Sequence, residues 1–120
     1  MEEYRSEHGE ALALYNAIVN CDDVYLVDKI KSAMDILFEG LNRYGPDQLF
    51  SSFNGGKDAV VIMHLLRAVT AKYSETTGAI LRAKFIYFAI EDEFPEVLEY
   101  IEEYKALYAL DLITYEGGIV

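Results

Sequence analysis

The chain has 120 residues, enough for one small domain, and its hydrophobic fraction of 52% indicates a folded core, which excludes an extended disordered chain. Its formal net charge is −11, so it lacks the cationic face that binding to a nucleic-acid backbone requires. Its apolar runs are too short to span a membrane, it shows no secretory signal, and its single cysteine, Cys21, rules out an intrachain disulfide. We therefore expect a cytoplasmic protein with no membrane or nucleic-acid partner.

The first part of the chain has the pattern of two helices. Apolar residues recur every three or four positions as far as Val19, and again over a longer stretch after Asp22-Asp23, with charged residues on the other side. The two aspartates can cap the second helix, and Gly45-Pro46 ends it. We expect residues 1–45 to form a helical layer against one side of a sheet.

The stretch from Gln48 to Leu66 has the pattern of a strand, a tight glycine turn and a buried helix. A short apolar run stops at Asn54-Gly55-Gly56, and a continuous apolar segment starts at Ala59. Adjacent glycines let a ligand approach the main chain closely, and the N-terminus of the following helix favours an anion. The pattern predicts a phosphate site, although a plain connection between a strand and a helix can also contain two glycines.

The rest of the chain alternates helices with strands. We expect a helix over about 58–73, apolar nearly all round and so packed on more than one side, followed by a loop or frayed helix end over 72–82. Residues 84–90 have the composition of a short strand that is covered on both faces. A helix then starts at Pro95, and 110–115 form a third strand. The order α, α, β, α, β, α, β predicts an α/β fold with a parallel sheet.

This topology leaves part of the sheet uncovered. Two right-handed crossovers that step in the same direction place both crossover helices on one face of the sheet. The N-terminal helix pair can cover the opposite face only in part, which leaves an open edge for an oligomer partner or for a missing C-terminal half. Because the chain stops just past a strand, at Ile119-Val120, we expect it to be the N-terminal part of a longer domain.

The segment SFNGGKD, from Ser52 to Asp58, resembles the PP-loop of the ATP-pyrophosphatase superfamily. The form with Asn before the glycines and Lys-Asp after them is similar to that of eukaryotic-type FAD synthetase (FMN adenylyltransferase), which is related to PAPS reductase. The segments FIYFAIEDEFPE and LDLITYEGG are similar to later parts of the same family. The resemblance implies a PP-loop, Rossmann-like fold of the adenine nucleotide alpha hydrolase type. Residues 46–120 would be the N-terminal part of the ATP-binding domain, with 1–45 as a helical extension.

The resemblance implies a reaction in which ATP and FMN give FAD and pyrophosphate, with Mg²⁺ as the metal. It assigns catalysis to Asn54, Lys57 and Asp58. It places ATP and pyrophosphate on the loop, at Ser52, Phe53, Asn54, Gly55, Gly56, Lys57 and Asp58. It places adenine at the end of the second strand, at Phe88, Ala89 and Ile90. A carboxylate of Asp58 or Asp92 would hold the metal.

Two alternatives remain open at this point. The first is another PP-loop enzyme, such as a PAPS reductase or an ATP-dependent thiolation enzyme, but Cys21 lies before the loop and is badly placed for the catalytic cysteine that those enzymes use. The second is a nucleotide-binding domain without catalysis, because no basic residue follows Lys105 to stabilise phosphate charge. His64, inside an apolar run, is expected as a core or rim residue and not as a metal ligand.

Overall fold

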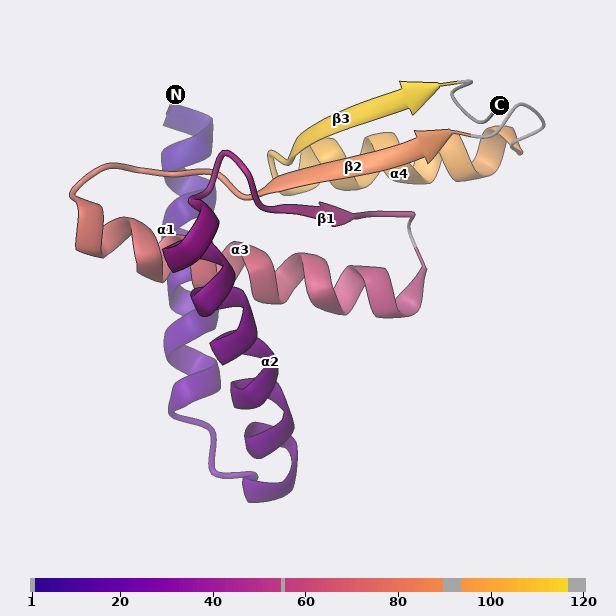
Figure 1. The fold of residues 1–120 in the computed structure, drawn as a ribbon. Helices are drawn as coiled ribbons and strands as arrows, with labels where there is room; N and C mark the ends of the chain where they lie inside the picture. The colour runs from indigo at the N-terminus through magenta and orange to yellow at the C-terminus, as the bar shows by residue number, and fades with distance from the viewer. Residues whose placement is uncertain (1, 55, 90–93, 117–120) are drawn as a thin grey trace.

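The computed structural model describes residues 2–54, 56–89 and 94–116 (Figure 1). The elements follow the predicted order of two helices and then strands alternating with helices. They are α1 (Glu2–Val19), α2 (Val24–Tyr44), β1 (Phe50–Ser52), α3 (Lys57–Thr77), β2 (Lys84–Ala89), α4 (Pro95–Leu107) and β3 (Asp111–Glu116). Within the described ranges, none of the helices is both long and apolar enough to cross a membrane.

The strands form one parallel sheet in the order β1-β2-β3. The register pairs Phe50 with Lys84 between the first two strands, and Phe88 with Tyr115 between the second two. Because all strands run the same way, their carboxyl ends lie toward one edge, with the turn into α3 and the start of α4 on the same side of the molecule (Figure 1). The predicted α/β class and parallel sheet are confirmed.

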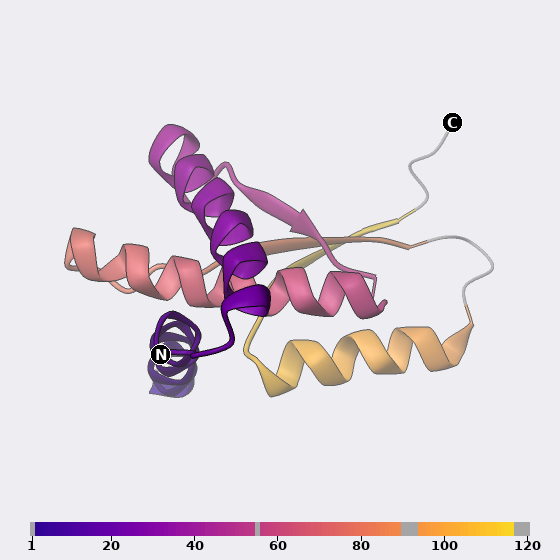
Figure 2. The same ribbon diagram turned by 90° about the horizontal axis from the view of Figure 1, so that it is seen from below.

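Both crossover helices, α3 and α4, lie on the same face of the sheet, as two right-handed crossovers in one direction require (Figure 2). One buried cluster joins this inner face to the two helices. It consists of Phe53, Met63, Leu66, Phe85, Tyr87, Ile101, Leu110 and Leu112. The principal core of the described chain therefore lies between the sheet and α3 and α4, and it includes Phe53, the first residue after β1.

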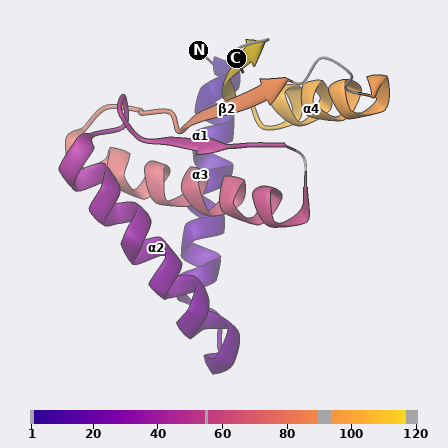
Figure 3. The ribbon, with the colours of Figure 1, turned by 45° about the vertical axis from the view of Figure 1, so that its right-hand side comes forward.

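The N-terminal helices pack on α3 and not on the opposite face of the sheet, which corrects the expected partial cover of that face. Helix α3 is apolar nearly all round, so it offers α1 and α2 a second apolar side. Met34 and Leu41 of α2 form a buried cluster there with Leu65 and Val69 of α3. In Figure 3, α3 lies below the strands, and most of α2 lies below α3.

The outer face of the sheet is exposed, contrary to the prediction that β2 is covered on both faces. Phe88 of β2 and Tyr115 of β3 are each 53% exposed, and Phe50 and Ile113 are each 46% exposed. The sequence pattern misleads here because an apolar strand in a parallel sheet usually has helices on both faces. In the described residues, the helices gather on the inner side only.

Helix α3 continues to Thr77, beyond the end predicted from the sequence. The hydroxyl of buried Ser74 donates to the carbonyl of Thr70 at 2.7 Å and accepts the N–H of Leu81 at 3.0 Å. Gly78 then ends the helix with a φ of 76°, and its N–H donates to the carbonyl of Ser74. The polar end of the helix forms because this buried hydroxyl and the glycine cap outweigh the weak helix propensity of the residues.

Candidate functional site

Phe53, the residue directly after β1, anchors the turn into α3. Its N–H donates to the carbonyl of Ile86 at 2.9 Å, which continues the attachment of this segment to β2 by one residue. Its side chain is fully buried, and the centroid of its ring lies 5.6 Å from that of Tyr104 on α4. The start of the turn is therefore held by the backbone and by the core. The N–H of Phe53 is already engaged in this anchoring.

Asn54 and Gly56 shape the turn itself. The side-chain Oδ1 of Asn54 accepts a hydrogen bond from the N–H of Gly56 at 2.8 Å. Gly56 has extended backbone angles, with φ −70° and ψ 162°, and its carbonyl accepts the N–H of Val60 at 2.9 Å. That bond opens α3. Gly55, also a predicted site residue, lies outside the described residues.

The first turn of α3 contains N–H groups that the helix itself cannot satisfy, because no carbonyl lies one turn before them. The residue at the N-cap is Gly56, so no side chain caps these groups. Lys57 and Asp58 begin the helix, and both are exposed. The helix dipole adds partial positive charge at this end. Together these features suit a phosphate or another anion.

The other predicted site residues lie at the carboxyl ends of the neighbouring strands. Ser52 is the exposed last residue of β1, and the register places it two positions before Phe88 of the neighbouring strand. Phe88 is exposed, and Ala89, which ends β2, is half-buried. Ile90 and Asp92 lie outside the described residues. The structure thus brings the loop and the end of β2 to one side of the sheet.

Tyr115 is a residue of this edge that the sequence motifs do not single out. It pairs in register with Phe88, and the centroids of the two rings lie 6.0 Å apart. The signal for it in the sequence is the alternation along β3, because Leu112 is buried on the inner face and Ile113 and Tyr115 share the outer one. The two rings form an exposed aromatic surface beside the end of β2.

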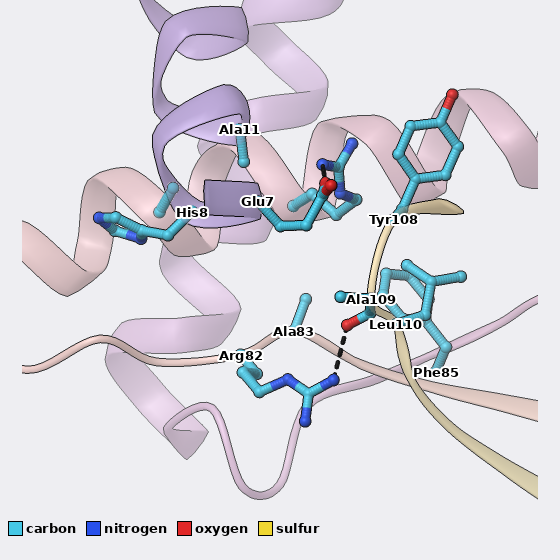
Figure 4. Close-up of a pocket in the computed structure, with 11 residues that line it drawn as sticks. Glu7, His8, Ala11, Arg82, Ala83, Phe85, Tyr108, Ala109 and Leu110 are labelled. Atoms are coloured by element: carbon cyan, nitrogen blue, oxygen red, sulfur yellow. Dashed lines mark hydrogen bonds and ion pairs between the residues drawn. The ribbon is translucent and has the colours of Figure 1, made fainter. Parts of the chain in front are cut away.

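A small cavity lies at the opposite end of the sheet, close to where β2 and β3 begin (Figure 4). Glu7 and His8 of α1 line it, together with Arg82, whose side chain donates to the carbonyl of Ala109 at 2.6 Å. Its volume of about 20 Å³ has room for about one water molecule, far less than a nucleotide needs. This cavity is therefore not part of the candidate site.

Residues 48–119 match the family described as the phosphoadenosine phosphosulfate reductase domain. The chain is 34% identical over 102 residues to a probable FAD synthase of Caenorhabditis briggsae, an overlap that covers 85% of this chain and 19% of that protein. It is 32% identical over 92 residues to a probable FAD synthase of Schizosaccharomyces pombe, which covers 75% of this chain and 35% of that protein.

Solved structures share the fold. The structure of Candida glabrata FMN adenylyltransferase in complex with FMN and the ATP analogue AMPCPP matches with a TM-score of 0.70 and 16% identity, over 98% of this chain and 43% of that one. Yeast FAD synthetase in complex with FAD matches with a TM-score of 0.68 and 20% identity, over 96% and 44%. These matches confirm the predicted fold. The chain spans less than half of the solved chains and 19% to 35% of the two FAD synthases.

Proposed function

The chain belongs to the phosphoadenosine phosphosulfate reductase domain family, and we propose that it carries the ATP-binding half-site of an FMN adenylyltransferase. The reaction would transfer AMP from ATP to FMN and give FAD and pyrophosphate. The observation that carries the proposal is the SFNGGKD segment, which joins the end of β1 to the first turn of α3, a helix N-terminus that no side chain caps. The similarity to probable FAD synthases supports FMN as the acceptor.

The phosphates that leave as pyrophosphate would lie ahead of α3. The N–H groups of Lys57 and Asp58 would donate to their oxygens, and the ammonium of Lys57 would add a point charge. Local donors matter here because the net charge of −11 makes the overall field unfavourable to an anion. In adenylyl transfer these groups would act by holding the triphosphate in line and by neutralising charge on the leaving oxygens.

Asp58 fits a Mg²⁺ ion that arrives with ATP. Mg²⁺ is usually bound by one or two carboxylates together with substrate phosphates, and seldom by a cage of protein ligands alone. No such cage of three or more His, Cys, Asp or Glu side chains occurs in the part of the chain that the structure describes. A single exposed carboxylate beside the phosphates therefore suits this metal, with Asp92 as a second candidate ligand. When bound, Mg²⁺ would supply positive charge at the leaving group.

Adenine would lie at the carboxyl end of β2. The main-chain groups of Phe88, Ala89 and Ile90 would recognise its edge, as ligands of parallel sheets commonly lie beyond the carboxyl ends of the strands. The exposed rings of Phe88 and Tyr115 lie beside this position and offer an apolar surface. This placement puts adenine on the neighbouring strand and the triphosphate on the loop, which matches the two ends of one ATP molecule.

A second candidate function is nucleotide binding without transfer. The observation that favours it is the charge distribution, because the chain has no Lys or Arg after Lys105. Attack by the FMN phosphate brings a second anion toward the triphosphate, and cations that offset this negative charge stabilise the transition state. With Lys57 and Mg²⁺ as its cations, the proposed site would leave part of that charge uncompensated.

Calorimetric titration of the 120-residue chain separates these candidates. Mg²⁺-ATP is titrated first and FMN second, and the mixture is then analysed for FAD by chromatography. Binding of both with formation of FAD supports the transferase, whereas binding of ATP alone supports the second candidate. Lys57→Ala should weaken ATP binding, and Lys31→Ala, at an exposed lysine of α2, should not. A folded chain that binds no ATP would overturn both.

A further inference from the structure

A groove of about 430 Å³ lies between α1 and α3, and we call it the α1–α3 groove. It is lined by Glu10, Leu14, Ile18, Val61, His64, Leu65, Arg67 and Tyr108. Figure 2 shows the three elements around it, with α1 seen end-on beside α3 and the last turn of α4 close by. Small-molecule sites in proteins have volumes of about 300–1,000 Å³, so the groove is in the range for a ligand.

The long walls of the groove are apolar. Leu14 and Ile18 lie one helical turn apart on α1 and are half-buried. Across from them on α3, Leu65 is buried and Val61 is 53% exposed. When another apolar group covers an exposed apolar side chain such as that of Val61, the free energy of the system decreases. The walls therefore favour a ligand whose larger part is hydrocarbon or aromatic.

Arg67, at the polar end of the groove, is already neutralised. Its Nη2 lies 2.9 Å from Oε2 of Glu7, and the two side chains are only 9% and 15% exposed. Its guanidinium carbon also lies 4.5 Å from the centroid of the Tyr108 ring. Because a carboxylate and an aromatic face already engage this cation, it does not call for an anionic ligand.

His64 supplies a hydrogen-bond donor at the same end. Its Nδ1 lies 3.2 Å from Nη1 of Arg67, and a guanidinium can only donate, so Nδ1 accepts. A neutral imidazole that accepts at Nδ1 carries its hydrogen on Nε2. Burial, and then the charge of Arg67, lower the pKa of His64, which favours the neutral ring. The edge-on contact with Tyr108, with ring centroids 4.8 Å apart, orients the imidazole.

We propose that the α1–α3 groove binds an uncharged, mostly apolar small molecule that accepts a hydrogen bond from Nε2–H of His64 through a carbonyl or similar group. A negative charge on the ligand is disfavoured by Glu10 on the lining and by the acidic excess of the whole chain. A positive charge would lie beside the guanidinium of Arg67, and the nearby carboxylate of Glu7 is already engaged by that guanidinium. This site differs from the proposed ATP site, which depends on the turn before α3.

The probe for this proposal is Nile red, which is uncharged, largely aromatic and carries a carbonyl acceptor. We expect a saturable titration of the methyl-labelled chain in which the ¹³C methyl signals of Leu14, Ile18 and Val61 shift together. Val61→Glu should weaken binding at least about tenfold, because it places a charge on the apolar wall. His64→Phe keeps a ring beside Tyr108 but removes the donor, and should weaken binding by about threefold to tenfold.

Ile113→Glu is the matched control, because Ile113 is a similarly exposed apolar residue on the outer face of the sheet. It should leave the affinity for Nile red unchanged. The proposal is overturned if the methyl signals of Ile86 and Ile113 shift in place of those of the groove, if no methyl signal saturates, or if Val61→Glu has no effect. Equal affinity in wild type and His64→Phe would show that His64 does not donate to the ligand, and the requirement for a hydrogen-bond acceptor on the ligand would then be wrong.

Discussion

The side-chain Oδ1 of Asn54 lies 2.8 Å from the backbone nitrogen of Gly56 and accepts its hydrogen bond. A β-carbon built on Gly56 would lie only 2.9 Å from the same oxygen. The φ of Gly56, −70°, is open to every residue, so the backbone does not require glycine here. The side chain of Asn54 therefore leaves little room for a side chain at position 56. An anion bound in the turn would reduce this room further.

Substitutions at these two positions should therefore be coupled. Gly56→Ala displaces the Asn54 side chain and should lower the free energy of unfolding by about 1 kcal/mol, the value of one hydrogen bond. In an Asn54→Ala background the same change should cost little, because the oxygen is absent. A double-mutant cycle by urea denaturation measures the coupling. Additive effects would show that the contact does not limit position 56.

Gly56→Val should abolish ATP binding while most of the helical signal remains. The branched side chain would displace Asn54 and also occupy the space ahead of α3 where the phosphates are proposed to lie. Circular dichroism reports the helices, and calorimetry with Mg²⁺-ATP reports binding. Unchanged ATP affinity in this variant would remove the turn from the site.

Asp58→Asn should weaken the binding of Mg²⁺-ATP but not the binding of ATP without the metal. The change removes a proposed Mg²⁺ ligand, so affinity for Mg²⁺-ATP should fall by about tenfold or more. It also removes a negative charge near the phosphates, so affinity for ATP in EDTA should stay equal or rise. Calorimetry in the two buffers tests this, with Asp35→Asn at an exposed position of α2 as the control. Parallel losses in both buffers would argue against a metal role.

The ion pair between Glu7 and Arg67 should contribute to the docking of α1 on α3. The two side chains are nearly buried, so Glu7→Ala leaves a largely buried guanidinium with one carboxylate fewer and should cost about 2 kcal/mol. The pair Arg43–Glu39 is the control, because its side chains are 65% and 61% exposed. Glu39→Ala should change stability by less than about 0.5 kcal/mol. Equal losses in urea denaturation would contradict this difference.

Stability should decrease in mildly acidic solution through His64. Burial, and then Arg67, lower the pKa of this residue in the folded chain, so the unfolded chain binds the proton more readily. The destabilisation is absent well above the ordinary pKa of 6.5 and grows as the pH falls below it. His64→Phe should flatten the dependence of unfolding free energy on pH between about 7.5 and 5. An unchanged slope would assign the effect to other groups.

The sequence correctly predicted the structural elements that depend on local sequence patterns. The apolar run before Asn54-Gly55-Gly56 and the apolar helix after it predict the turn between β1 and α3, and the alternation of elements predicts the parallel sheet. Pro95 predicts the start of α4, because its missing N–H costs nothing in a first helical turn. The shared side of α3 and α4 follows from the handedness of the crossovers.

The sequence could not predict the features that depend on tertiary packing. The apolar face of α2 is equally compatible with a sheet or a helix as its neighbour, so the sequence did not reveal that Met34 and Leu41 pack on α3. The end of α3 depends on the burial of Ser74, which no local pattern shows. Tyr115 becomes part of the candidate site only through its register with Phe88 across two strands.

The most direct test of the phosphate site is a ¹H–¹⁵N spectrum of the labelled chain during titration with Mg²⁺-ATP. We expect the backbone amide signals of Lys57 and Asp58 to shift most and to saturate together, because these N–H groups would donate to the phosphate oxygens. The phosphate site is contradicted if these two signals stay in place while ATP binds, or if the largest shifts cluster around Arg67 and Arg82 at the opposite end of the sheet.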